Sequence, residues 1–233
     1  MRNAGEAPAG SHELVFDVTD ADAVIRAARE VGELDALVLN AGIAIAAPLE
    51  YLPAEELTRQ LYVYVVGQLR TLQPFLPALR ATRGRVVLMG SVGGKSALPF
   101  LGAYAMSKFA LEAMADALRV ELAPFGVHVS IVEPGTIATP MWTKPQRTLD
   151  EFPPEAAQLY GERIEKFRRL AQHRSSTAGV PPDEVAKAVE HALTSPKPKT
   201  RYVVGPDARR RSRLQRLPDR LRDRVLTRYL FGS

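Results

Sequence analysis

Three residues of this chain suit proton chemistry: Ser91, Tyr104 and Lys108. Tyr104 and Lys108 are four positions apart, so a helix would place them on one face, one turn from each other. Because an ammonium beside a phenol favours the phenolate, we expect the pKa of Tyr104 to lie below its ordinary value of about 10. Such a tyrosine can give or take a proton at a carbon–oxygen centre. Ser91 ends the apolar run RVVLMG and could hydrogen-bond to the same oxygen, which would suit interconversion of an alcohol and a carbonyl.

Alternating strand and helix patterns surround these residues and predict a parallel sheet covered on both faces. The expected strands cover residues 14–16, 36–39, 85–90, 127–132 and 201–204, and the expected helices cover 20–32, 53–80, 102–124 and 182–193. We expect the helix from residue 53 to be interrupted or bent near Pro74 and Pro77, because proline lacks the amide donor of a helix interior. Strand 85–90 would carry Ser91, and helix 102–124 would carry Tyr104 and Lys108.

Polar or glycine-containing segments follow three of these strands. They are Asp17-Val18-Thr19-Asp20, Asn40-Ala41-Gly42 and the segment from Pro134 to Thr139. A tyrosine and a lysine four apart are by themselves consistent with an ordinary solvated helix. Parallel sheets bind ligands at the carboxyl ends of their strands, so the three segments favour a site instead.

These motifs resemble the classical short-chain dehydrogenase/reductase family. The resemblance rests on the serine thirteen residues before Y-x-x-x-K, on N-A-G, on D-V-T-D and on P-G-x-x-x-T, and it extends from about residue 12 to 205. The later runs RYVVGPDA and LPDRLRD resemble the retinol- and 17β-hydroxysteroid-dehydrogenase-like members. The resemblance implies a Rossmann-like, doubly wound α/β sheet and an NAD(P)-dependent oxidoreductase.

The resemblance also implies roles for individual residues. Tyr104 would be the general acid/base, Lys108 would lower its pKa and hold the nicotinamide ribose, and Ser91 would orient the substrate oxygen. Asp17 and Val18 would flank the adenine, Asn40, Ala41 and Gly42 would line the cofactor path, and Pro134, Gly135, Ile137 and Thr139 would lie at the carboxamide end. Arg2 stands where NADP-preferring members place a basic residue, which favours NADP.

Two departures from the family pattern affect these expectations. The glycine-rich turn T-G-x-x-x-G-x-G, which cradles the cofactor diphosphate at a helix N-terminus, is not found before residue 14. We expect a late start or a true truncation, weaker dinucleotide binding, and an apolar edge at strand 36–39. Tyr64 stands where the family usually has an asparagine associated with a proton-relaying water, and packing is its simpler interpretation.

Composition is consistent with one domain spanning residues 1–233. The chain has 233 residues, no cysteine and a net charge of +5, which excludes disulfides and thiolate metal sites and suits a reducing cytoplasm. Its four histidines show no metal-ligand spacing, and no run reaches the roughly 18 apolar residues of a membrane span. Within the domain we expect a mobile arm at 1–13, a substrate-loop region at 138–180 and a basic helical tail at 206–233.

The partners implied by the sequence follow from these segments. Met141 and Trp142 in the substrate-loop region favour a hydrophobic alcohol or ketone. The basic tail could contact a membrane surface weakly, although Leu214, Leu217, Leu221 and Val225 recur at helical spacing and favour packing on the domain itself. No nucleic-acid motif accompanies the arginines. By resemblance the chain forms a homodimer or homotetramer, and a catalytically impaired member acting only through association is the alternative to an enzyme.

Overall fold

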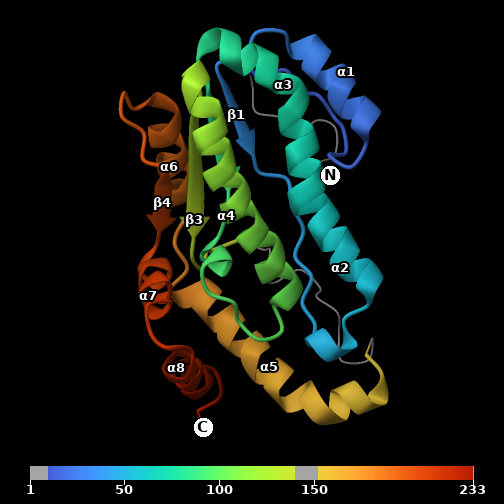
Figure 1. Cartoon of the computed structure of the whole chain (residues 1–233). Helices are drawn as coiled ribbons and strands as arrows, with labels where there is room; N and C mark the ends of the chain where they lie inside the picture. The colour runs from blue at the N-terminus through green and yellow to red at the C-terminus, as the bar shows by residue number, and fades with distance from the viewer. Residues whose placement is uncertain (1–9, 140–151, 233) are drawn as a thin grey trace.

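The computed structural model describes residues 10–139 and 152–232, and these build one four-stranded parallel sheet (Figure 1). The strands lie side by side in the order β1-β2-β3-β4. Their bounds are Ala36–Leu39 for β1, Arg85–Met89 for β2, His128–Pro134 for β3 and Arg201–Val204 for β4. Leu37 pairs with Val86 and Val86 pairs with Val129, so the carboxyl ends of these strands meet at one edge of the sheet.

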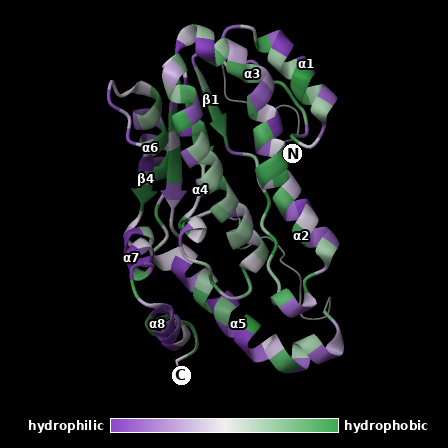
Figure 2. Cartoon of the chain, viewed as in Figure 1, coloured by the Kyte–Doolittle hydropathy of each residue, from purple (hydrophilic) through white to green (hydrophobic). Residues whose placement is uncertain are grey.

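Helices cover both faces of the sheet, as the sequence predicted. α3 (Gln68–Thr82) and α4 (Gly102–Leu122) pack on one face, with α1 (Ala21–Val31) against α3, and α6 (Pro182–Thr194) packs on the other. Leu72, Leu88 and Leu111 are fully buried in the larger core between α3, α4 and the sheet. Figure 2 shows β1 and β4 as hydrophobic and much of α8 as hydrophilic, which agrees with a sheet buried between layers.

Strand β1 is an edge of the sheet among the described residues. It pairs with β2 alone, and Val38 is 38% exposed, which confirms the predicted apolar edge. The strand predicted at residues 14–16 does not form, and that prediction was wrong. A short apolar run becomes a strand only where a partner accepts its backbone hydrogen bonds, and no described strand lies beside it. The following helix α1 begins as predicted, with Asp20 accepting from the Ala23 amide at 3.0 Å.

The long helix after residue 53 has three parts. They are α2 (Ala54–Leu61), the π-helical segment η2 (Tyr62–Gly67) and α3. The helix is not interrupted at Pro74 and Pro77, since both prolines lie inside α3, so that part of the prediction was wrong. Pro77 and Gln73 are exposed, so water can bind the carbonyl that loses its amide partner. The winding changes instead at η2, whose buried side carries Tyr64.

Three further helices gather at the carboxyl ends of the strands (Figure 1): α5 (Pro154–Thr177), α7 (Pro206–Leu214) and α8 (Asp219–Phe231). The sequence did not predict α5, because its apolar positions are too few to form a clear helical pattern. Of the four apolar residues expected to pack on the domain, Leu214 and Leu217 are half-buried. The expectation was wrong for Leu221 and Val225, which are 43% and 38% exposed, and Leu230 is the buried residue of α8. Among the described helices, none combines the length and hydrophobicity that crossing a bilayer requires.

Candidate active site

Ser91, Tyr104 and Lys108 come together at the carboxyl end of β2. Ser91 lies two residues beyond this strand, and α4 presents Tyr104 and Lys108 one turn apart. The Ser91 hydroxyl hydrogen-bonds to the Tyr104 phenol and accepts from the Gly93 amide at 3.0 Å. All three side chains line one cavity of about 1010 Å³.

Most of the other predicted site residues line the same cavity. Those that do are Asn40, Pro134, Gly135, Ile137 and Thr139. Asp17, Val18, Ala41 and Gly42 are not among its lining residues. The Asp17 carboxylate instead accepts from the Thr19 amide and hydroxyl, at 2.8 and 2.7 Å, and these bonds lower its pKa. The predictions for Arg2, Met141 and Trp142 concern residues outside those that the structure describes.

Lys108 is buried against two tyrosine rings. Its ammonium donates to the Met89 carbonyl at 2.7 Å and lies 3.9 Å from the ring centroid of Tyr64 and 5.6 Å from that of Tyr104. Burial lowers the pKa of Lys108 to about 7, although the nearby Glu112 carboxylate favours the charged form. Lys108 is therefore a cation whose charge can be lost near neutral pH.

The pKa of Tyr104 is raised, which is the opposite of the predicted direction. Burial raises this pKa above its ordinary value, while the hydrogen bond from Ser91 and the charge of Arg211 lower it to a smaller extent. The expected lowering was wrong for this structure because desolvation of the phenolate outweighs its stabilisation by neighbouring groups. Tyr104 therefore holds its proton at neutral pH.

Tyr64 takes part in the site through packing. Its ring meets the Tyr104 ring edge to face at 6.1 Å between centroids, and it lines the cavity. A Cβ atom at Gly42 would lie 2.2 Å from the Tyr64 hydroxyl oxygen, so this glycine leaves room for the ring. The position that would hold an asparagine by resemblance thus carries an aromatic face directed at Lys108.

Two buried glutamines that the sequence analysis missed hold the segment after β1. The Gln60 amide accepts from Ile45 N at 3.0 Å and donates to Ile43 O and to the Ser107 hydroxyl, at 3.2 and 3.1 Å. Gln68 donates to Ala41 O at 3.1 Å. Their signal in the sequence is weak, since glutamine is common on exposed helix faces.

Asp207 was also missed, and it fixes the segment after β3. Its Oδ2 accepts from the amide and the hydroxyl of Thr136, both at 2.8 Å. A Cβ atom at Gly135 would lie 2.1 Å from Asp207 Oδ1, so glycine is needed there. The quoted run RYVVGPDA contains Asp207, but its partner lies 71 residues earlier in the chain.

The residues around Lys108 fit the nicotinamide half of NAD(P). An ammonium has three donors, and Lys108 uses one on Met89 O, while Asn40 and Thr139 add an amide and a hydroxyl to the same cavity. For the diphosphate, the described residues offer no glycine-rich turn that opens a helix after a strand. Within those residues there is also no group of three or more His, Cys, Asp or Glu able to hold a metal ion.

Comparison with known proteins agrees with this geometry. Human (Homo sapiens) 17-beta-hydroxysteroid dehydrogenase type 1 is 40% identical over 84% of this chain and 61% of that protein, so the chain spans less than two thirds of that relative. Retinol dehydrogenase 5 from Mus musculus is 39% identical over 93% of the chain and 73% of that protein. The NADPH-dependent 3-dehydrocapnine reductase of Ornithobacterium rhinotracheale is 35% identical over 92% of the chain and 78% of that protein.

Structural and family comparisons agree as well. The crystal structure of a short-chain dehydrogenase from Streptomyces avermitilis superposes with a TM-score of 0.74 at 30% identity, over 92% of this chain and 77% of that one. The family model described as short chain dehydrogenase matches residues 3–150. The family match and these relatives show that the chain belongs to the short-chain dehydrogenase family.

Proposed function

We propose that this protein is an NAD(P)-dependent oxidoreductase that interconverts an alcohol and a ketone or aldehyde on a hydrophobic substrate. The observation that carries the proposal is the hydrogen bond between Ser91 and Tyr104 beside the buried ammonium of Lys108, within one cavity. The bound nicotinamide supplies or takes up the hydride, and the side chains supply placement and proton transfer.

Each of the three residues has a separate role in this proposal. In the direction of carbonyl reduction, the Tyr104 hydroxyl donates its proton to the substrate oxygen. Ser91 donates a hydrogen bond to the same oxygen and stabilises the charge that develops there. Lys108 offsets the negative charge left on the phenolate. The raised pKa of Tyr104 supports this direction, because the residue is protonated and ready to donate.

The cofactor preference proposed here is for NADP. Arg2 favours the 2′-phosphate by resemblance, and the name of the Ornithobacterium relative states that it depends on NADPH. The proposed substrate is apolar, since the names of two relatives refer to a hydroxysteroid and to retinol. Leu98, Leu101 and Phe167 line the cavity and support the same choice.

The test follows the oxidation of NADPH by the full chain with a hydrophobic ketone, at pH 7. Tyr104→Phe should lower the rate by about 10²–10⁴-fold and leave NADPH binding nearly unchanged, because the phenol moves the proton and contributes little to holding the dinucleotide. Tyr62→Phe is the matched control: this tyrosine is 37% exposed, lies outside the cavity lining, and accepts from Arg70. Equal rates for wild type and Tyr104→Phe would rule out Tyr104 as the proton donor.

Self-association is a second proposal, and it applies with or without catalysis. Apolar side chains are exposed on η2, α3 and α4: Val66, Leu69, Met106 and Phe109 are 37–45% exposed. Burying such a patch against a second copy would favour a dimer. Sedimentation equilibrium should show a dimer or tetramer that Phe109→Glu dissociates. A monomer at every concentration would contradict it.

A further inference from the structure

Two arginines that the proposed proton chemistry does not use line the cavity that contains Tyr104. Arg174 comes from α5 and Arg211 from α7. Within the described part of the chain, neither guanidinium forms an ion pair with a carboxylate within 4.0 Å. Arg174 stacks at 5.2 Å over the ring of Tyr229, and Arg211 donates through Nη2 to the Ser96 carbonyl.

The burial of Arg211 is only partly compensated. Its Nε is buried and has no hydrogen-bond partner. Burial lowers the pKa of Arg211 to about 10, and the charge of Arg174 acts in the same direction. The nearby Asp207 favours the charged form, but its Oδ2 atom already accepts two bonds from Thr136, and its Oδ1 atom, which has no hydrogen-bond partner among the described residues, does not lie within 4.0 Å of the guanidinium. A guanidinium in this setting would be stabilised by an anion that accepts from its free donor.

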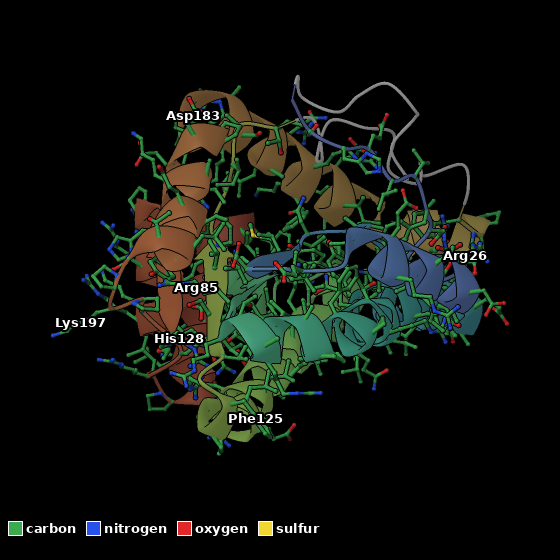
Figure 3. The ribbon with its side chains drawn as sticks, turned by 90° about the horizontal axis from the view of Figure 1, so that it is seen from above. Arg26, Arg85, Phe125, His128, Asp183 and Lys197 are labelled. Carbon is green, nitrogen blue, oxygen red and sulfur yellow. The ribbon has the colours of Figure 1, made fainter. Side chains whose placement is uncertain are left out.

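Among the described residues that line the cavity, Glu190 of α6 carries a carboxylate, but it lies at the end of the cavity away from the two arginines. α6 follows Val180, which bridges to Ile137 just beyond the carboxyl end of β3. Near the far end of α6, the Ala192 carbonyl accepts from Arg85 at the amino end of β2. Figure 3 shows Arg85 well away from Asp183 at the start of α6. Glu190, two residues before Ala192, therefore lies toward the amino ends of the strands, away from the two arginines.

The surface leading to the two arginines is apolar. Phe167, Leu170 and Ala171 precede Arg174 by seven, four and three positions, so they share one face of α5, and all four residues line the cavity. Leu230 of α8 joins them. Arg211 is also close enough to Tyr104 to affect its pKa electrostatically. The cavity thus combines a reactive hydroxyl, an apolar wall and two cations.

We propose that Arg174 and Arg211 form an oxyanion subsite, and that the substrate is an apolar ketone or alcohol that also carries an anionic oxygen group such as a carboxylate. This inference rests on the proposed function for the reacting carbonyl, but the subsite itself is defined by the two guanidinium groups. The carboxylate binds between them, accepting from Arg211 Nε, while the hydrocarbon part contacts the apolar face of α5.

Binding is tested first, without cofactor, by calorimetric titration of the full chain with decanoate and with 1-decanol at pH 7. Decanoate should bind at least tenfold more tightly than decanol. Arg174→Met and Arg211→Met should each lower that preference at least tenfold. Arg163→Met is the matched control, because Arg163 is on the same helix and stacks on Phe231 at 5.4 Å but does not line the cavity, and it should keep the preference.

Folding and cofactor binding are controlled in the same experiment. Among the described residues, the Arg174 guanidinium stacks on the Tyr229 ring and forms no ion pair, so Arg174→Met should fold even if Arg211→Met does not, as judged by circular dichroism. Equal affinities for decanoate and decanol would overturn the subsite. So would a loss in Arg163→Met as large as in Arg174→Met. If the arginine variants lost NADPH affinity in parallel with decanoate affinity, the arginines would serve the cofactor phosphates and the proposal would be wrong.

Turnover separates this inference from the proposed function. With NADPH, the wild-type chain should reduce 4-oxodecanoate with at least tenfold higher kcat/KM than its methyl ester. Reduction of the ester with no advantage for the acid would leave the oxidoreductase proposal standing and overturn the subsite. Arginine-dependent binding of decanoate with no reduction of either ketone would support the subsite and count against the oxidoreductase.

Discussion

Burial moves the pKa values of Lys108 and Tyr104 in opposite directions, and at both residues it favours the neutral form. The pKa of Lys108 falls to about 7 and that of Tyr104 rises. At pH 7 the lysine is at its titration midpoint while the tyrosine is protonated. The Tyr64 ring excludes water from both groups, which favours their neutral forms, while its cation–π contact with the Lys108 ammonium at 3.9 Å favours the charged lysine. The pair is thus suited to proton donation at or below neutral pH.

Lys108 predicts a specific dependence of stability on pH. Its folded pKa of about 7 lies below the ordinary value of 10.5, so between these values the unfolded chain binds more protons. The free energy of unfolding should therefore rise with pH, by about 3 kcal/mol from pH 7 to 9.5 at 1.36 kcal/mol per pKa unit. Urea unfolding should show this rise in the wild-type chain. The control variant Lys187→Met should show the same rise, because the ammonium that it removes is exposed. If Lys108→Met showed an equal rise, another group would be responsible.

At the scale of elements, the π-helical segment η2 joins the two halves of the site. It directs Tyr64 against Gly42 in the segment after β1 and against Lys108 in α4. Gln60 and Gln68, on either side of η2, hold the same segment through Ile43, Ile45 and Ala41. The position of Asn40 in the cavity therefore depends on the helix that follows it.

The contact between Gly42 and Tyr64 can be measured by a double-mutant cycle. Gly42→Ala alone should lower the free energy of unfolding by about 1–3 kcal/mol, because its Cβ would overlap the tyrosine ring. Tyr64→Ala alone should cost about 3–5 kcal/mol, as expected for removal of a buried aromatic ring. In the Tyr64→Ala background, Gly42→Ala should cost far less, and urea unfolding of the four proteins gives the coupling. Strict additivity would contradict the overlap.

At the scale of the whole molecule, a charge network ties α4 to the strands. Glu112 Oε2 lies 2.7 Å from Lys95 and 3.1 Å from Arg201, and Glu133 Oε1 lies 3.2 Å from the same Arg201. Arg201 also pairs with Asp116 at 2.7 Å. Burial raises the pKa of Glu133 to about 7, so its charge depends on these cations. Arg201 pairs with three carboxylates, those of Glu112 and Asp116 in α4 and that of Glu133 in β3, which is more than Lys95 does.

Removal of the Arg201 side chain should therefore lower the stability of the fold. Arg201→Ala should lower the free energy of unfolding by about 2–4 kcal/mol, toward the lower part of the range for a broken buried pair, because its side chain is 29% exposed. Arg119→Ala removes a pair of the same 2.7 Å length whose carboxylate, that of Asp116, is 47% exposed, and it should cost less than about 1 kcal/mol. Both are measured by urea unfolding at pH 7. Equal costs would show that burial of Glu133 does not matter here.

The sequence by itself determined the elements and the reactive residues. The spacing of Tyr104 and Lys108 and the apolar runs of β1–β4 depend on near neighbours, so their periodicity could be recognised without the fold. The short run at 14–16 was the exception, because a strand needs a partner that periodicity does not supply. The polar helix α5 was missed for a related reason, since its apolar positions are few.

Only the tertiary structure decided the environment of those residues. Asp207 meets Thr136 across 71 positions of the chain, Tyr64 packs on Gly42, and Arg211 of the basic tail enters the cavity instead of facing solvent. The direction of the pKa change at Tyr104 was decided in the same way. A pKa depends on desolvation and on every nearby charge. Both are set by the residues that the fold brings around the cavity, and the spacing of residues along one helix does not reveal them.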